Sequence, residues 1–390
     1  MPIVNRVADL KDEIAGWRRH FHAHPELLFD VHETAATVAG KLTAFGCDEV
    51  VSGIGRTGVV AVIKGNRPGG GARKVVGLRA DMDALPIEEA TDLPWKSATP
   101  GKMHACGHDG HTAMLLGAAK YLAESRNFAG TAVVIFQPAE EGGGGGEAMV
   151  KDGLMERFGI EEVYGMHNAP GLPVGEFAIC SGPIMASTDN ITVTIEGTGA
   201  HAAQPHLGID PIVVGTQIVT GLQTIVARNV DPLESAVVSI CTFQAGNADN
   251  VIPQTALLRG TARSFKPGVR ALLARRIAEV IEGTARVYGA RVNFQWRPGY
   301  PVLSNHARET AFAIAVASEV AGTSRVDPAM TPIMGGEDFA YMLQARPGAF
   351  IFVGNGDSYG LHHPRYDFND DAIAWGSSYW VRLVETAMAA

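Results

Sequence analysis

The 390-residue chain is 46% hydrophobic and 19% charged, with 32 Lys and Arg residues against 41 Asp and Glu residues. This composition is typical of a globular protein and excludes a disordered chain, a collagen and a membrane-spanning protein. The net charge of −9, with no basic cluster, argues against nucleic acid as a partner. Four scattered cysteines give no disulfide framework, and no signal-peptide pattern is visible, so we expect a cytoplasmic protein.

Helical and strand-like patterns alternate through the first half of the chain. Apolar residues recur at helical spacing over roughly 5–45, with a break near Pro25, and again over 112–124. A turn-rich segment, GNRPGGGAR, separates the first two predicted strands. The strand patterns cover 59–65, 75–83, 131–141 and 163–170. This alternation predicts a mostly parallel sheet built from βαβ units.

The pattern changes near Gly182 and Pro183. Over 184–299, two amphipathic helices are interspersed with alternating strands in the order β-α-β-β-α-β, which predicts a compact, ferredoxin-like α+β domain. In the remaining segment, 300–390, the pattern is again that of the first half of the chain. We therefore predict an α/β protein whose large domain, 1–183 plus 300–390, is interrupted by a smaller domain over 184–299.

Two glycine-rich segments resemble nucleotide-binding loops without meeting their requirements. Gly53–Gly58 fits G-x-G-x-x-G, but a strand pattern follows it, whereas a dinucleotide fingerprint requires a helix there. The Gly142–Gly146 run lacks the Lys-Ser/Thr of a P-loop. The first segment is therefore predicted to form a hairpin, and neither predicts phosphate binding.

The strongest chemical signal is His104–His111, which holds three histidines, a cysteine and an aspartate within eight positions. These side chains include soft and borderline metal ligands, and Gly107 and Gly110 would let the backbone curl so that they converge. The alternative is a solvated polar loop. No second Cys or His pair completes a structural zinc site, so any further ligands must come from elsewhere in the chain.

Other polar residues follow predicted strands, where open α/β sheets bind their ligands. Glu140 and Glu141 end one strand, and one of them would bind metal while the other transfers protons. Asp83 is suited to a hydrogen bond that fixes the tautomer of a ligand histidine, or to helix capping. His167 and His362 each follow a strand and fit a dispersed metal site.

Motifs spread in order over essentially the whole chain resemble the aminoacylase and carboxypeptidase family of dinuclear metallopeptidases, peptidase family M20. The resemblance is closest to its amidohydrolase branch, which contains hippurate hydrolases, N-acyl-amino-acid amidohydrolases and auxin-conjugate hydrolases. The motifs that carry it are RRHFHAHPEL, RADMDALPI, MHACGHDGHTAMLLGAA, FQPAEEGGGGGEAMV, GMHN, GAHAAQPHLGIDP, MGGEDFAY and LHHPRY.

This resemblance implies Glu140 as general base and the 184–299 domain as a lid that dimerises. It implies two divalent metal ions per subunit, bound by Cys106, His108, Glu141, His167 and His362. The wider superfamily usually has a histidine ligand where this chain has Asp81, so contact between Asp81 and metal stays open. A thiolate ligand favours Zn²⁺, Co²⁺ or Mn²⁺ over Mg²⁺.

The expected reaction is metal-dependent hydrolysis of the amide bond of small N-acyl amino acids, of the hippurate or N-acetyl type. A metal-activated water would attack, and Glu140 would remove its proton. The alternatives are a di- or aminopeptidase of the same family and a non-catalytic, metal-dependent binding protein. A retained Glu140 favours an enzyme over a binder.

Three residues of the smaller domain are expected to meet the substrate. In dimerising relatives, a histidine placed like His201 reaches the partner's active site and stabilises the oxyanion, whereas the alternative is that it caps a turn in its own protomer. Arg263, together with Asn250, is a candidate for binding the substrate's α-carboxylate. We therefore expect a homodimer or a tetramer, with a small molecule as the other partner.

Overall fold

The computed structural model describes residues 3–68 and 74–389, so the last five residues of the predicted turn over 65–73 lie outside the described residues. The chain divides into two compact units. The first unit comprises Met1–Ile184, Ser304–Thr331 and Asp338–Ala390, and the second comprises Met185–Leu303 and Pro332–Glu337. The second unit therefore includes a short segment, 332–337, that the sequence pattern did not separate from the large domain.

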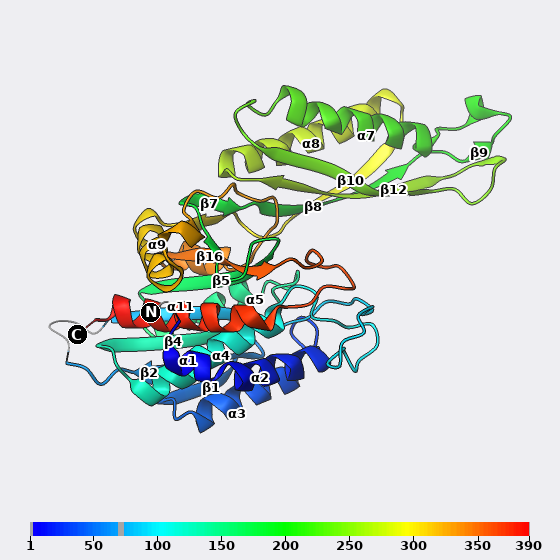
Figure 1. Cartoon of the computed structure of the whole chain (residues 1–390). Coiled ribbons are helices and arrows are strands. Elements are labelled where there is room, and N and C mark those ends of the chain that lie inside the picture. The colour runs from blue at the N-terminus through cyan, green and yellow to red at the C-terminus, as the bar shows by residue number, and fades with distance from the viewer. Residues whose placement is uncertain (1–2, 69–73, 390) are drawn as a thin grey trace. The chain divides into compact units, whose positions relative to one another are not determined.

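The first unit contains an eight-stranded sheet in the order β1-β2-β4-β3-β5-β16-β6-β15 (Figure 1). The adjacent strands β4, β3, β5 and β16 run parallel, and antiparallel pairs flank them. This mostly parallel sheet confirms the predicted α/β class. The strands are β1 (Glu49–Ile54), β2 (Gly58–Lys64), β3 (Lys74–Asp81), β4 (Gly130–Gln137), β5 (Glu162–Pro170), β6 (Phe177–Ala178), β15 (Val326–Asp327) and β16 (Gly348–Gly356).

The hairpin predicted at Gly53–Gly58 is confirmed, because β1 and β2 pair antiparallel across this segment. The glycines therefore form a tight turn between strands and not a loop that opens a helix. Gly55 has φ +60°, which only glycine adopts without strain, and a Cβ there would lie 2.6 Å from the Met149 side chain.

Helices cover this sheet, since β2, β3 and β4 are buried along most of their length, as parallel strands packed on both faces are. Helix α4 packs against α2 and α11 and contacts β2, β3 and β5. The helices of this unit are α1 (Asn5–Asp9), α2 (Lys11–Ala23), α3 (His32–Ala44), α4 (His108–Ser125), α5 (Gly145–Lys151), α6 (Leu154–Arg157), α9 (Ala307–Ala321), α10 (Ala340–Ala345) and α11 (Ile373–Ala387).

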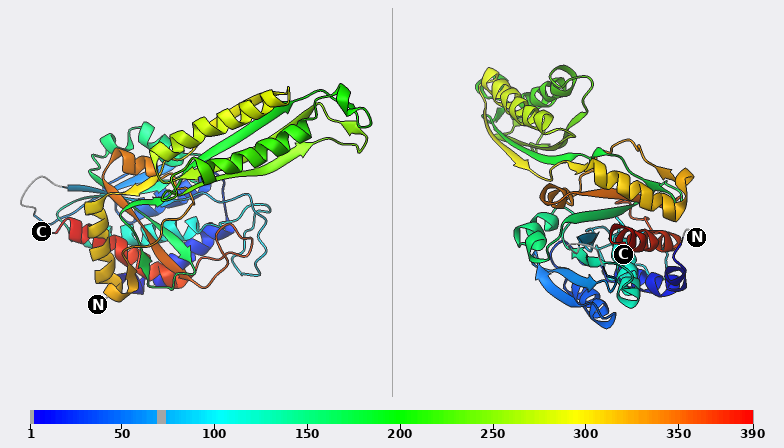
Figure 2. Two further views of the ribbon diagram at one scale, coloured as in Figure 1. Left: turned by 90° about the horizontal axis from the view of Figure 1, so that it is seen from above. Right: turned by 90° about the vertical axis from the view of Figure 1, so that its left-hand side faces the viewer.

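The second unit has the element order β-α-β-β-α-β, formed by β8 (Ser187–Glu196), α7 (Pro211–Arg228), β10 (Ala236–Ala245), β12 (Thr255–Ser264), α8 (Pro267–Val287) and β13 (Arg291–Pro298). Its antiparallel sheet has the order β10-β12-β8-β13. Helices α7 and α8 lie side by side on one face of this sheet (Figure 2). Two short strands, β9 (Ala200–His201) and β11 (Val251–Ile252), pair with each other. In the part of the chain that the structure describes, no helix has the length and apolar character needed to span a bilayer.

Two of the crossings between the units pass through short strands, β7 (Gly182–Met185) on the way out and β14 (Leu303–Asn305) on the way back, and the segment 332–337 makes the other two. The second unit also has a hydrophobic core of its own, in which Ile218, Leu258 and Ile277 are fully buried between the helices and the sheet. This separate core predicts that the second unit can be destabilised without unfolding the first.

Ile277→Ala should lower the free energy of unfolding of the second unit by about 2–5 kcal/mol, because it leaves a cavity under α8. Amide hydrogen exchange should accelerate across 185–303 and stay unchanged in α4. The matched control is Val287→Ala at the end of the same helix, where the side chain is 80% exposed and the expected change is within about 0.5 kcal/mol. Equal acceleration in both units would contradict independent cores.

Candidate metal centre

The polar residues of the sequence motifs meet at one edge of the large sheet. Because β4, β3 and β5 are adjacent and parallel, their carboxyl ends lie at the same edge. Asp81 ends β3, and His167 lies near the end of β5. Strand β4 ends at Gln137 and not at 141, so Glu140 and Glu141 lie in the turn that follows it. The structure therefore brings together residues that are far apart in sequence.

Helix α4 begins at His108, four residues before the predicted pattern at 112, so the motif straddles a turn and a helix. Gly107 precedes the helix with φ +88°, and a Cβ there would lie 2.2 Å from Asn168 Nδ2. Gly110 differs from our expectation, because it lies inside the helix and allows close packing: a Cβ there would lie 2.3 Å from the Phe368 ring.

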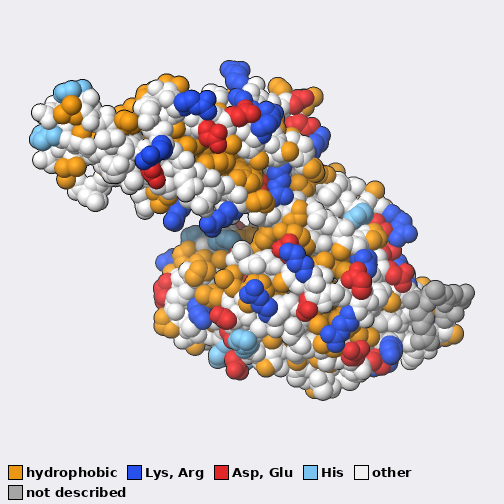
Figure 3. Space-filling view, turned by 180° about the vertical axis from the view of Figure 1, so that it is seen from behind, with side chains coloured by type: hydrophobic (Ala, Val, Ile, Leu, Met, Phe, Trp, Pro, Cys, Tyr) orange, Lys and Arg blue, Asp and Glu red, His pale blue; other side chains and the backbone are white. Residues whose placement is uncertain are grey.

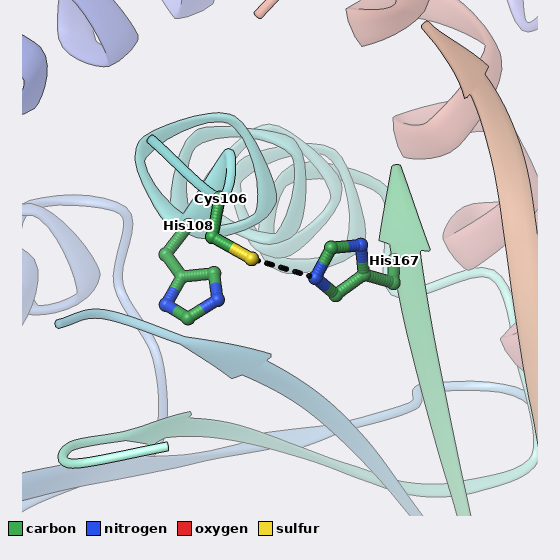
Figure 4. Close-up of side chains that lie close together, drawn as sticks. All are labelled: Cys106, His108 and His167. Atoms are coloured by element: carbon green, nitrogen blue, oxygen red, sulfur yellow. Dashed lines mark hydrogen bonds between the residues drawn. The ribbon is translucent and has the colours of Figure 1, made fainter. Parts of the chain in front are cut away.

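Five proposed ligands converge in the first unit. Cys106 Sγ lies 3.4 Å from His167 Nε2, and Figure 4 shows these side chains and His108 pointing toward one another from the start of α4 and from β5. Glu141 Oε1 lies 3.3 Å from His362 Nε2 and 4.0 Å from His108 Nε2. Two donors that share one tetrahedral ion at about 2.0–2.3 Å lie roughly 3.3–3.8 Å apart, so these spacings fit a bound metal.

Hydrogen bonds orient two of these imidazoles so that Nε2 is available to a metal. His108 Nδ1 lies 2.8 Å from the backbone oxygen of Asp83, and His167 Nδ1 lies 2.7 Å from the backbone oxygen of Asn168. A carbonyl only accepts, so each Nδ1 carries a proton, and in the neutral ring the lone pair lies on Nε2. His108 Nε2 is buried and makes no hydrogen bond to any described residue, as expected for an atom reserved for a ligand.

Asp83 holds this region by its backbone as well as by its side chain. Its carboxylate accepts hydrogen bonds from the backbone N–H groups of Glu140, at 2.9 Å, and Glu141, at 3.1 Å. The carboxylate is 3.5 Å from His108 Nδ1, farther than the Asp83 carbonyl oxygen. The residue thus orients His108 mainly through its carbonyl, while its side chain fixes the turn that carries both glutamates.

In the absence of a metal ion, burial and the nearby negative charges determine whether Cys106 and His108 are protonated. Burial, together with the charges of Glu141, Glu140 and Asp81, raises the pKa of the Cys106 thiol well above its usual value. For His108, burial lowers the pKa, but Asp81, Asp83 and Glu141 outweigh it and raise the pKa to about 10. Both residues therefore hold protons that a divalent ion would replace.

Three members of the His104–His111 motif lie outside this ligand set. His104 is buried with no hydrogen-bond partner among the described residues, and burial lowers its pKa to about 3. Asp109 lies 3.0 Å from Arg18 Nε and 2.8 Å from His22 Nδ1. His111 Nδ1 lies 2.6 Å from Asp81 Oδ1. The motif therefore contributes two of the proposed ligands, Cys106 and His108.

Sequence reasoning missed the residues that support the cysteine turn. Asn168 Nδ2 donates to the Cys106 carbonyl at 2.6 Å, and its Oδ1 accepts from the Tyr366 hydroxyl at 2.8 Å. Both supports are buried. Each lies in a motif that we quoted, since Asn168 follows His167 in GMHN and Tyr366 ends LHHPRY, but their partners are not visible in the sequence.

The three substrate residues predicted in the smaller domain all lie in the second unit. His201 is exposed, and its Nδ1 accepts from the backbone N–H of Ala203 at 3.0 Å, so it caps a local turn. Asn250 directly precedes β11, the strand that pairs with β9 and His201. Arg263 lies near the other end of β12, eight residues or roughly 26 Å beyond Thr255. Within one protomer, the structure therefore does not bring Asn250 and Arg263 together.

The model of peptidase family M20/M25/M40 matches residues 77–386 of the chain. The chain belongs to this family. It is 42% identical to a hippurate hydrolase of Campylobacter jejuni over 98% of both chains. It is 41% identical to an N-acetyl-L-cysteine deacetylase of Bacillus subtilis, over 96% of this chain and 88% of that protein. These relatives place it in the amidohydrolase branch of the family, as a metal-dependent amidohydrolase.

Solved structures agree with this assignment. A Bacillus subtilis protein described as a dinuclear metal binding peptidase from the M20 family superposes with a TM-score of 0.83 at 36% identity, covering 98% of this chain and 99% of that one. A Staphylococcus aureus protein described as a putative aminohydrolase gives a TM-score of 0.88 at 32% identity, covering 99% of each chain. The fold and the use of divalent metal ions are therefore those of the M20 family.

The turn before α4 gives a test of how this amidohydrolase positions its cysteine. Gly107→Ala should lower stability by more than the roughly 1–2 kcal/mol that a positive φ costs, because the new Cβ would displace Asn168, and it should reduce metal content. Gly101→Ala is the matched control, with φ +74° and no atom within 4 Å of the new Cβ. Thermal unfolding and elemental analysis measure both effects. Equal behaviour of the two variants would reject the proposed support of the cysteine turn.

Proposed function

We propose that this amidohydrolase cleaves the amide bond of small N-acyl amino acids, of the hippurate or N-acetyl type. The observation that carries the proposal is the convergence, beside the acid Glu140, of ligand atoms from Cys106, His108, Glu141, His167 and His362. We propose that these five residues bind two divalent ions per subunit. The names of the relatives, a hippurate hydrolase and a deacetylase of N-acetylcysteine, support the substrate class.

Glu140 is proposed as the general base. Bound divalent ions would polarise the substrate carbonyl and lower the pKa of an attacking water. Glu140 is buried, its backbone N–H is held by Asp83, and its carboxylate lies within 4.8 Å of ligand atoms of His108 and Glu141. From this position it removes a proton from the water and returns it to the leaving amine.

The donor set favours Zn²⁺, Co²⁺ or Mn²⁺, because the thiolate of Cys106 is a poor ligand for Mg²⁺.

Two alternatives predict different substrates: a di- or aminopeptidase would prefer peptides, and a binding protein would turn over nothing. A screen of hippurate, N-acetyl amino acids and dipeptides, each with added Mn²⁺, Co²⁺ or Zn²⁺, separates the three. The proposal requires the highest kcat/KM on an N-acyl amino acid.

Glu140→Gln should lower kcat by at least about 100-fold while metal content and circular dichroism stay unchanged, because proton transfer is lost and the ligands remain. The matched control is Glu147→Gln, which removes a partly exposed carboxylate that pairs with Lys151 on α5. The control should keep full activity. Near-normal turnover by Glu140→Gln would exclude Glu140 as the base.

We further propose that the protein acts as a dimer formed through the second unit. Strand β10 is an edge strand of the four-stranded sheet, and unpaired edges recruit further strands unless they are protected. Phe243 on this strand and Ile212 and Val213 on α7 are exposed. Hydrophobic side chains are visible over the surface of this unit (Figure 3). A second copy of the chain would cover such a surface.

His201 is proposed to stabilise the oxyanion in the partner's site. Because its Nδ1 accepts from Ala203, the proton of the neutral ring lies on Nε2, which makes the exposed end of the ring a hydrogen-bond donor. Turn capping and oxyanion binding are therefore compatible. Asn250 precedes β11 and Arg263 lies near the far end of β12, and this separation supports the same arrangement, since both could contact one substrate carboxylate only from different protomers.

Complementation tests this arrangement. His201→Ala and Glu140→Ala should each be nearly inactive as homodimers, because loss of an oxyanion donor costs roughly 10²–10³ in kcat. After subunit exchange, about half of the dimers are hybrids, and each hybrid holds one intact site, so activity should return to roughly a quarter of wild type. Native mass spectrometry measures the exchange. An inactive mixture with proven exchange would show that His201 does not act across the interface.

A further inference from the structure

Asp81 lies close enough to the proposed centre to bind metal, but both of its oxygens already have partners. Its Oδ2 is 3.7 Å from His108 Nε2, within the spacing of two ligands on one ion. The same Oδ2 is 2.7 Å from Arg79 Nη1, and Oδ1 is 2.6 Å from His111 Nδ1. All four residues are buried in the first unit.

Arg79 is fixed in this position by other contacts. Its Nε donates to Gln137 Oε1 at 2.9 Å, and its Nη2 donates to Asp338 Oδ1 at 3.2 Å. Asp338 is held in turn by the backbone N–H of Gly146 at 2.7 Å. The guanidinium keeps its charge at every accessible pH and cannot follow Asp81 if that carboxylate turns toward a metal ion. Such a movement would break the buried ion pair between Arg79 and Asp81, which is unfavourable even though Asp338 stays in place.

His111 closes the other side of Asp81. Its Nε2 accepts the backbone N–H of Asn168 at 2.9 Å, so Nδ1 carries the proton and donates it to Asp81. Both ring nitrogens of His111 are therefore engaged in hydrogen bonds. In the group formed by Asp81, His108 and His111, the only nitrogen or carboxylate oxygen with no hydrogen bond to a described residue is His108 Nε2.

We propose that Arg79 is a positioning residue that keeps Asp81 out of the metal shell. Arg79 and His111 bind the two Asp81 oxygens, so His108 would share its ion with Cys106 and His167, whose ligand atoms lie within 4.8 Å of one another, and the Asp81 carboxylate would not join them. An added carboxylate would raise the affinity for harder ions such as Mn²⁺ and Mg²⁺ relative to Zn²⁺ and Co²⁺, so the exclusion of Asp81 shifts the preference of the centre toward Zn²⁺ and Co²⁺. This inference rests on the metal centre proposed above.

Metal binding tests the proposal without using catalysis. Wild type, Asp81→Asn, Arg79→Met and the double variant are stripped with a chelator and titrated with Co²⁺, recording visible absorption and bound metal. Asp81→Asn should keep the wild-type Co²⁺ stoichiometry and spectrum. Arg79→Met should change the spectrum and raise Mn²⁺ affinity roughly tenfold, the scale on which outer partners tune metal sites. The double variant should return to the wild-type spectrum, since the released carboxylate is absent.

The outcomes separate this proposal from the proposed function. If wild type binds Co²⁺ but Asp81→Asn loses an ion or changes the spectrum, Asp81 is a ligand and the proposal is overturned. An unchanged Arg79→Met, or a double variant that keeps the altered spectrum, also overturns it, while the metal centre stands. If wild type binds no Co²⁺, the metal centre itself is rejected. Should Arg79→Met fail to fold, Arg79→Lys takes its place in both comparisons, because a single ammonium group cannot reproduce the fork of donors that holds Asp81.

Discussion

The burial of negative charge at the carboxyl edge of the large sheet is the constraint on which the site depends. Asp81, Asp83, Glu140 and a largely buried Glu141 lie there beside the Cys106 thiol, where ionised groups are costly unless cations face them. Arg79 supplies one fixed cation. Without metal, the remaining balance comes from protons, as the pKa of about 10 at His108 and the raised pKa of the Cys106 thiol indicate.

This constraint affects the carboxylate of Asp81, which is paired with Arg79, differently from those of Asp83 and Glu141. Burial opposes ionisation of Asp81, but His108, Arg79 and His111 lower its pKa well below the usual range, so it is a stable anion with fixed partners. Burial raises the pKa of Asp83 despite its contacts with His108. A carboxylate already neutralised by Arg79 would gain little from a metal ion, whereas Glu141, which faces the imidazoles of His108 and His362 beside the Glu140 carboxylate, would gain much more.

Much of this arrangement follows from patterns that the sequence displays. The alternation of strands and helices predicts the parallel sheet, and the rule that ligands gather at carboxyl ends places Glu140, Glu141 and His167 at one edge before any coordinates are known. The hairpin at Gly53–Gly58 follows from the strand pattern after it. The spacing of apolar residues and the place of a polar residue after a strand pattern are both local features, and they can therefore be recognised in the sequence alone.

The features that the sequence did not reveal depend on contacts between distant segments. The role of Gly110 depends on Phe368, and that of Arg79 depends on Gln137 and Asp338, partners that no local pattern identifies. Helix α4 starts at His108 because Gly107 adopts a left-handed conformation against Asn168, whereas the apolar periodicity begins only later. Apolar periodicity therefore marks the apolar part of this helix and misses its polar first turn, which is equally buried.

The three residues of the second unit that are proposed to meet the substrate lie in two separate places. His201 and Asn250 lie at the paired strands β9 and β11, while Arg263 lies near the opposite end of β12. A substrate with a carboxylate and a developing oxyanion needs donors at two points a few ångströms apart, which a single rigid sheet cannot supply from both of its ends. An antiparallel dimer would bring opposite ends of two such sheets together, because two-fold symmetry reverses one sheet relative to the other. Edge pairing along β10 would therefore join composite sites as well as bury apolar surface.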